Sequence, residues 1–200
     1  APVALLVLLV GVAAWGITAE ATARGVSSVM ASLEEQLAAS ARVLATRYSS
    51  FEGRSEKKAS QEWLDHQASS LAMALPSPVL GLWQDLEAPP LISLPPDAAA
   101  PSTWVNRIAA PAPSWLASAA SWRGMTGLPP ANPEERLGAG ALAASARVGG
   151  AGGGDDAGLL LVLLPLERPV VEHLRLATGI HLHPVLAMGD GNSVRSGRGG

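Results

Sequence analysis

The chain opens with an apolar run that leads directly into a long stretch of helical periodicity. Residues 1–19 carry no charge and consist mainly of Leu, Val and Ala, and Glu20 is the first charged residue. A helix of that length reaches roughly 28 Å, close to the hydrocarbon thickness of a bilayer. Trp15 lies near the end of the run, where an indole favours the headgroup region. The pattern predicts a transmembrane helix, a location in the plasma membrane and a domain on its extracytoplasmic side.

Two alternatives exist for this first segment. Ala19-Glu20-Ala21 fits the small-x-small pattern of a signal-peptide cleavage site. The apolar run is longer than the usual signal-peptide core of about 7 to 15 residues, and the helical pattern continues past the site, which favours an uncleaved anchor. A buried core helix this apolar would need protein on every side, and a chain of 200 residues offers little to surround it.

Residues 20–52 form the next unit, which we expect to be a helical stalk. An apolar stripe recurs there at steps of three and four residues, while the charged residues fall off the stripe. A narrow stripe of this kind predicts pairing with a second copy in a parallel homodimer. Packing on the chain's own domain is an equally good interpretation, because Ala41 makes a weak seam. The stripe comprises Met30, Leu33, Leu37, Ala41, Leu44, Tyr48 and Phe51.

Residues 53–188 have the pattern of a small α+β domain. A polar break precedes a second helix over residues 60–75, and the short apolar segment 79–86 predicts a buried strand. Residues 88–133 are rich in Pro and Ala. They predict a region dominated by loops, with one short helix over residues 114–122.

The last part of the domain carries the clearest pattern. Residues 137–148 and the fully apolar residues 159–164 predict two strands joined by a glycine-rich hairpin loop over 149–158. Helical spacing follows over 167–178, and alternation over 180–186 predicts one more strand. The expected order is a hairpin, a helix and a strand on an antiparallel sheet.

This closing segment resembles part of a known class of proteins. The sequence LLLVLLPLERPVVEHLRLATGIHLHPV is similar to the end of extracytoplasmic sensor domains in bacterial membrane-bound signal transducers. In those domains an apolar strand, a PL-D/E-R turn, a helix, a TG stop and a final strand follow one another. The resemblance implies an α+β fold with one transmembrane helix, a long helical stalk and a small PAS- or Cache-like sensor domain with an antiparallel sheet.

The same resemblance implies a function. The resemblance implies that the chain is the sensory input region of a two-component sensor histidine kinase, or of a serine phosphatase with the same input architecture. This region would respond to a small-molecule or envelope signal. Residues 189–200 would then be the flexible end of a truncated chain, and any enzymatic activity would belong to the part that follows. The alternative is a membrane-anchored or exported envelope protein with no signalling output.

Charge, cysteine content and motifs argue against other classes of function. The formal net charge is −3 and no basic run stands out, so we expect no nucleic-acid partner. The chain has no cysteine, which excludes Cys-ligated zinc, Fe–S clusters and thiol nucleophiles. The glycine-rich loop lacks the Gly-Lys-Ser/Thr of a phosphate loop, and its Asp155 and Asp156 would repel phosphate. No G-x-S-x-G or H-E-x-x-H motif is present, so we expect neither a catalytic residue nor a cofactor.

Two groups of residues are candidates for binding. Four tryptophans are weak candidates for lining a ligand pocket, although covering the sheet is the more common role of such side chains. They are Trp83, Trp104, Trp115 and Trp122. His181 and His183 lie two residues apart and would project from one face of a strand, as a metal pair does. Because no third ligand is recognisable, we interpret them as ordinary, partly exposed histidines and predict no metal site.

Overall fold

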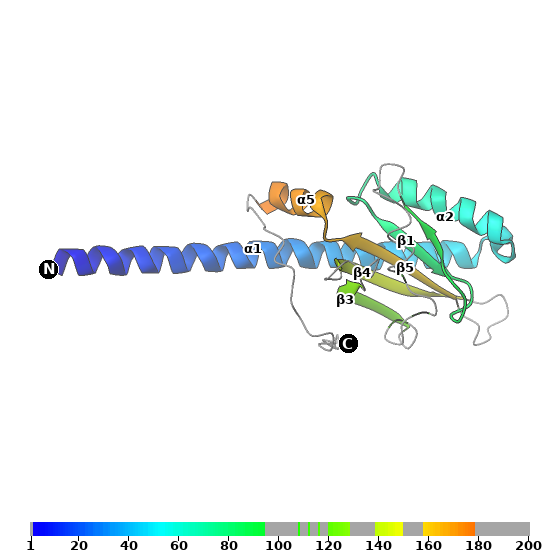
Figure 1. The fold of residues 1–200 in the computed structure, drawn as a ribbon, viewed down its shortest axis with the longest axis horizontal. Coiled ribbons are helices and arrows are strands. Elements are labelled where there is room, and N and C mark those ends of the chain that lie inside the picture. Colours follow the sequence, from blue (N-terminus) through cyan, green and yellow to red (C-terminus); the bar gives the residue numbers. More distant parts are fainter. Residues whose placement is uncertain are drawn as a thin grey trace, which may run out of the picture.

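The computed structural model describes most of the chain between residues 2 and 178. The described residues are 2–94, 108, 112, 116, 120–128, 139–149 and 158–178. Their side chains are described from Arg24 onward, apart from those of residues 26, 128, 139, 168, 169 and 178. The described part is a β-sheet with helices on one face and a long first helix that extends well beyond it (Figure 1).

Helix α1 (Pro2–Ser49) runs as one continuous element of 48 residues. Its second half lies along the sheet and its first half projects away (Figure 1). The apolar stripe of the second half is buried in the chain's own core, with Leu37 and Ala41 at 0% exposure. The structure therefore agrees with the interpretation that the stripe packs on the chain's own domain. A homodimer through the stalk stays a prediction, but the face formed by Leu33, Leu37 and Leu44 is already covered.

The predicted transmembrane helix and the predicted membrane location are wrong. Among the residues that the structure describes, no helix combines the length and the apolar character needed to cross a bilayer. The prediction rested on the uncharged length of residues 1–19, whereas in the structure residues 2–49 form one continuous helix. In the part of α1 with described side chains, apolar residues occupy one face and charged residues interrupt the rest. These charged residues are Arg24, Glu34, Glu35, Arg42 and Arg47.

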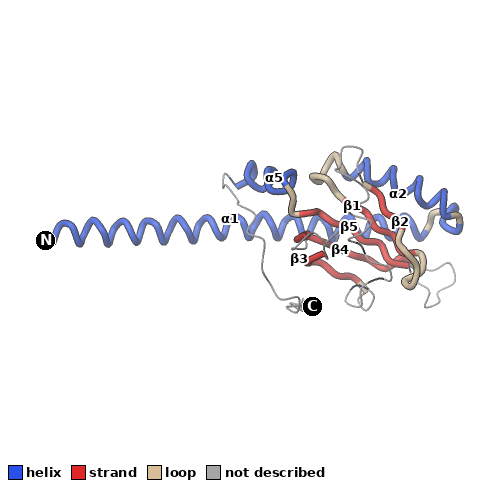
Figure 2. Tube along the Cα trace, in the orientation of Figure 1, coloured by secondary structure: helices blue, strands red, loops and turns tan. Residues whose placement is uncertain are grey.

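Among the described residues the sheet has five strands in the order β2-β1-β5-β4-β3, and every neighbouring pair is antiparallel (Figure 2). The central strand β5 is apolar on both faces and buried along its whole length. Such a strand requires cover on both sides. The strands are β1 (Val79–Trp83), β2 (Leu91–Ser93), β3 (Ser121–Leu128), β4 (Ala139–Val148) and β5 (Gly158–Pro165).

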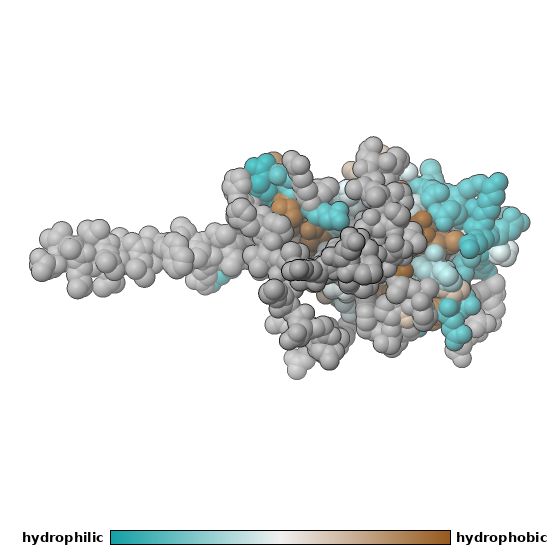
Figure 3. Space-filling model, viewed as in Figure 1, coloured by the Kyte–Doolittle hydropathy of each residue, from teal (hydrophilic) through white to brown (hydrophobic). Residues whose placement is uncertain are grey.

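Helices supply the cover on one face of the sheet. After the short turn η1 (Glu52–Ser55), helix α2 (Lys57–Leu71) packs against β1 and β2, burying Leu64 and Ala68. Hydrophilic residues gather on the surface at that end of the domain (Figure 3). Helix α5 (Arg168–Thr178) contacts α1 at the opposite end, where α1 leaves the sheet (Figure 1).

The sequence predicted part of this architecture. An α+β fold with an antiparallel sheet is present, and the predicted hairpin of residues 137–148 and 159–164 is confirmed by the pairing of β4 with β5. The helix predicted over 167–178 is confirmed as α5. Strands β2 and β3 fall in the region that the sequence predicted to be mostly loop. The strand predicted over residues 180–186 lies outside the described residues, as do most of the predicted loop and short helix between 95 and 119.

Candidate functional site

One face of the sheet brings together two of the four candidate tryptophans. Trp83 ends β1 and Trp122 stands near the start of β3, and both pack into the core on the face opposite α1. The strand register places Gly81, Leu161, Ser145 and Trp122 side by side across β1, β5, β4 and β3. We call this surface the tryptophan face. It consists of Val79, Gly81, Trp83, Trp122, Gly124, Thr126, Ala141, Ala143, Ser145, Arg147, Leu159, Leu161 and Leu163.

Each tryptophan ring lies near a glycine two residues away on its own strand. A Cβ atom on Gly81 would come within 3.3 Å of Trp83 Cζ3, and one on Gly124 within 3.4 Å of Trp122 Cζ2. Gly124 also has a φ of 150°, which side chains with a Cβ rarely adopt. The missing Cβ atoms let both rings lie close along their strands.

Small side chains lie between the two rings. Strand β4 contributes Ala141, Ala143 and Ser145 to the tryptophan face. The larger Leu159, Leu161 and Leu163 come from β5. Because side chains on neighbouring strands stand side by side, the face is lower over β4 than over β5 or the indole rings.

Two polar atoms on this face are buried without a hydrogen-bond partner among the described residues. They are Trp83 Nε1 and Ser145 Oγ. The Trp83 side chain is 0% exposed and Ser145 is 2% exposed, so neither atom reaches bulk water. An unpaired buried polar group costs about 1–3 kcal/mol, and folded proteins contain few of them. A polar group that reached either atom would therefore gain more than elsewhere on the sheet.

Residues from the long segment between β2 and β3 cover part of this face. Ile108, Ala112 and Leu116 are buried and belong to the same apolar cluster as Trp83. The backbone N–H of Ala112 donates to the carbonyl of Leu86 at 2.9 Å, which fixes this cover just beyond the end of β1. At these three described positions, residues of this segment therefore lie over the sheet.

The residue after Trp83 belongs to the other side of the sheet. Gln84 Nε2 donates to the Tyr48 hydroxyl at 2.7 Å and to the Ser60 hydroxyl at 3.0 Å, and it also reaches the carbonyl of Arg54 at 2.7 Å. The Tyr48 and Ser60 hydroxyls are 2.7 Å apart and buried. Two consecutive residues therefore connect the tryptophan face to the carboxyl end of α1, where Tyr48 lies.

The same end of α1 has further attachments. The Tyr48 ring packs against Phe51 and Trp63, with ring centroids 6.1 Å and 5.1 Å away. The backbone N–H of Gly149, just after β4, donates to the Ser49 hydroxyl at 2.9 Å. The guanidinium of Arg54 donates to the carbonyl of Ser49. The end of α1 is consequently held by groups that follow both β1 and β4.

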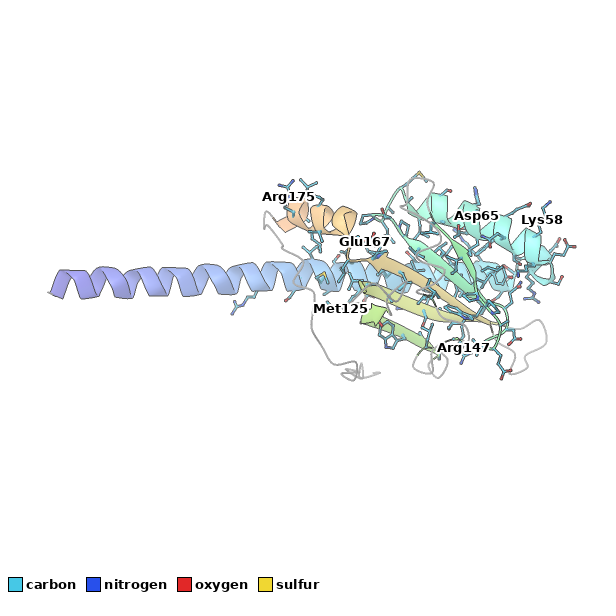
Figure 4. The ribbon with its side chains drawn as sticks, viewed as in Figure 1. Lys58, Asp65, Met125, Arg147, Glu167 and Arg175 are labelled. Carbon is cyan, nitrogen blue, oxygen red and sulfur yellow. The ribbon has the colours of Figure 1, made fainter. Side chains whose placement is uncertain are left out.

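The described residues offer no cluster of metal ligands. No group of three or more His, Cys, Asp or Glu side chains gathers within the described part of the chain. Asp65 accepts a hydrogen bond from Ser93 at 2.6 Å, which ties α2 to β2 (Figure 4). His181, His183, Trp104 and Trp115 lie outside the described residues.

Sequence reasoning identified Trp83 and Trp122 as candidates but missed Ser145. The only signal in the sequence is a hydroxyl within a strand that is otherwise rich in Ala. Which side of the sheet that hydroxyl faces, and that it shares this side with both indoles, depends on the strand order.

Comparisons with known proteins give no further guide to the site. No protein-family model matches the chain, and no match was found among curated proteins or solved structures. The geometry of the described residues therefore has to carry the argument about function.

Proposed function

We propose that this chain is the input domain of a signal-transduction protein, which binds a small molecule on the tryptophan face and passes its occupancy to helix α1. The observation that supports this most directly is the pair Trp83 and Gln84. One residue contributes a buried, unpaired donor to the tryptophan face, and the next holds the end of α1. A displacement of this short stretch of backbone would act on both.

The arrangement of the helices favours transmission out of the domain. Helix α1 is continuous from its contact with the sheet to its projecting half, so a shift at Tyr48 is carried along a stiff element. Helix α5 contacts α1 at the end of the sheet from which α1 projects (Figure 1). The resemblance of the closing segment to sensor domains of histidine kinases and serine phosphatases agrees with this role.

The energetics set a limit on such a signal. A bound molecule shifts the balance between two positions of α1 only by the difference in its affinity for them. The contacts that change must therefore be worth about as much as the shift they cause. The hydrogen bonds of Gln84 are of the right size, since each contributes on the order of 1 kcal/mol.

Hydrogen–deuterium exchange along α1 tests the proposed transmission. Gln84→Leu removes the amide but keeps most of the volume, and we expect exchange around Tyr48 to become roughly fivefold faster, the equivalent of about 1 kcal/mol. Trp83→Phe alters the tryptophan face, and we expect it to speed exchange around Tyr48 in the otherwise unchanged protein. In the Gln84→Leu background it should add nothing.

Gln61→Leu is the matched control. Gln61 also donates from its side-chain amide, but to Asp65 and to the carbonyl of Ile92, away from α1. With this variant as background, Trp83→Phe should still speed exchange around Tyr48. If Trp83→Phe acts on α1 equally with and without Gln84, or not at all, transmission through Gln84 is refuted. The alternative of a structural protein without signalling output is then favoured.

A further inference from the structure

Strand β3 lies at one edge of the sheet, and among the described residues no further strand pairs with its outer side (Figure 2). An edge strand presents a row of unpaired backbone N–H and C=O groups, which makes it a template for another strand. Every second residue of β3 is exposed, and the strand has eight residues and no proline. The exposed residues are Ser121, Arg123, Met125 and Gly127.

The hydrogen bonds to β4 show which residues of β3 direct their backbone groups outward. The N–H of Arg147 donates to the carbonyl of Ala120, and these two residues continue the register of β3 with β4. They are therefore a hydrogen-bonded pair, and such pairs recur at every second residue of an antiparallel ladder. Trp122, Gly124 and Thr126 consequently direct their backbone groups toward β4. The outward groups belong to the exposed residues Ser121, Arg123, Met125 and Gly127.

These outward residues are arranged symmetrically around Gly124, so a second copy of the same strand matches them. In an antiparallel pairing about a two-fold axis at Gly124, Arg123 stands opposite Met125 of the second copy. Ser121 stands opposite Gly127 in the same way. Every outward N–H and C=O group of both copies is then paired. The two Gly124 residues meet on the axis, at a non-hydrogen-bonded position where strands approach most closely and a side chain would be crowded.

The side chains on both faces of the sheet are compatible with this pairing. The Trp122 ring lies along Gly124, with Cζ2 at 3.4 Å from the place of a Cβ atom. The Trp122 rings of two copies would therefore stand on neighbouring strands about 5 Å apart, within the range of aromatic pairs. On the other face Met125 is 59% exposed. The stem of Arg123, whose guanidinium donates to Glu35 on α1, would cover it in the second copy.

Helix α1 leaves room for the second copy. It lies mainly over β4, so the α1 helices of two copies would be separated by three strand spacings, or roughly 14 Å. Packed helices need only about 8–10 Å. A peptide from another protein fits this edge less well, because added strands are selected through pockets for alternate side chains. The outward residues of β3 are small, polar or charged apart from Met125.

We propose that two copies of this chain pair through β3, antiparallel about Gly124, to form one continuous sheet. The two-fold axis makes both α1 helices lie on the same face of that sheet and run in opposite directions. The inference goes beyond the proposed function, and its interface differs from the parallel pairing of stalks expected from the sequence.

Opposite charges at Met125 test this interface on the full chain. A lysine there would stand opposite Arg123 of the second copy and repel it, whereas a glutamate would attract it. In sedimentation over a range of protein concentrations, Met125→Glu should dimerise about tenfold more tightly than Met125→Lys, since the symmetric dimer contains two such pairs. The net charge of −3 would by itself favour the lysine variant. Met73→Lys adds the same charge at another exposed methionine and should leave association unchanged.

Amide hydrogen exchange identifies what occupies the edge. The amides of Arg123 and Met125 should exchange quickly in dilute protein and slowly in concentrated protein, whereas that of Gly124, which is bonded to β4, should be protected in both. Protection of the outward amides in a chain that sediments as a monomer would mean that another segment of the same chain covers the edge. Fast exchange at all concentrations would mean that no copy pairs there. Either result overturns the proposal, as does association that is insensitive to the sign of the charge at Met125.

Discussion

Replacing Leu37 by alanine would show what covers the apolar stripe of α1. Leu37 is 0% exposed and lies in the core between α1 and the sheet. The change removes three carbon atoms, which corresponds to about 2–3 kcal/mol of lost burial. The space left behind adds to this, so we expect a total loss of about 3–4 kcal/mol in the free energy of unfolding.

Val43→Ala is the control on the same helix. Val43 is 50% exposed, so its truncation removes little buried surface. Alanine is also the better helix former. The free energy of unfolding should therefore change by less than about 0.5 kcal/mol. A difference of several kcal/mol between the two variants would exceed the effect of the one extra carbon atom removed from Leu37, so it would arise mainly from what lies against each side chain.

Urea denaturation followed by tryptophan fluorescence measures both variants, and thermal unfolding gives a second reading. For a domain of this size a loss of 3–4 kcal/mol lowers the Tm by roughly 10 °C. The loss should be the same at every protein concentration, because the covering sheet belongs to the same chain. The reasoning is refuted if Leu37→Ala leaves the unfolding of the domain unchanged but weakens a homodimer. A weakened homodimer would be seen as a Tm that rises with protein concentration in the unsubstituted chain but not in the variant.

Two further substitutions test the packing of the sheet. Gly158→Ala should destabilise the protein by about 1–3 kcal/mol in urea denaturation, because the added Cβ would lie 2.5 Å from the carbonyl oxygen of Trp83. Gly127→Ala, where no atom lies within 4 Å of the added Cβ, should not. Leu161→Asp should abolish the folded circular-dichroism spectrum, since it buries an unpaired charge in the central strand. Met73→Asp, at a side chain 85% exposed, should fold normally, and equal behaviour of the two would mean that the inside of the domain is assigned wrongly.

Local pattern was sufficient to predict the elements at the end of the domain. Strand β5 has an uninterrupted apolar run, and α5 has a clear helical repeat that buries Val170 and Leu174. Strand β3 gave no such signal. Its sequence SWRGMTGL has two glycines and few residues that favour strands. Its pairing with β4 over eight residues supplies the stabilisation that its own composition lacks.

The cover of α1 was not predictable in the same way. The spacing of the apolar residues in the stripe that contains Leu33 and Leu37 is the same whether a second helix or a sheet lies against it. The sheet that covers it is formed by residues more than a hundred positions later in the chain, chiefly those of β4 and β5. The transmembrane prediction for residues 1–19 relied on apolar length, and no helix among the described residues is long and apolar enough to cross a bilayer.

The candidate site depends even more on long-range structure. Trp83 and Trp122 lie on one face only because β5 and β4 stand between their strands in the order observed. The number of residues between Trp83 and Trp122 in the sequence does not indicate that the two side chains share a face. Ser145 joins them through register alone, since a shift of one residue would turn its hydroxyl toward α1.

The identity of residue 145 is the strongest support for the proposal that this face binds a molecule. Its neighbours on β4 are mostly Ala, and alanine at this position would fit the same space without a hydroxyl that costs free energy when unpaired. The same reasoning applies to Trp83, where a phenylalanine would fill much of the volume without an orphaned N–H. These two costs on one face, next to a residue that holds α1, support the proposal that the face binds a molecule.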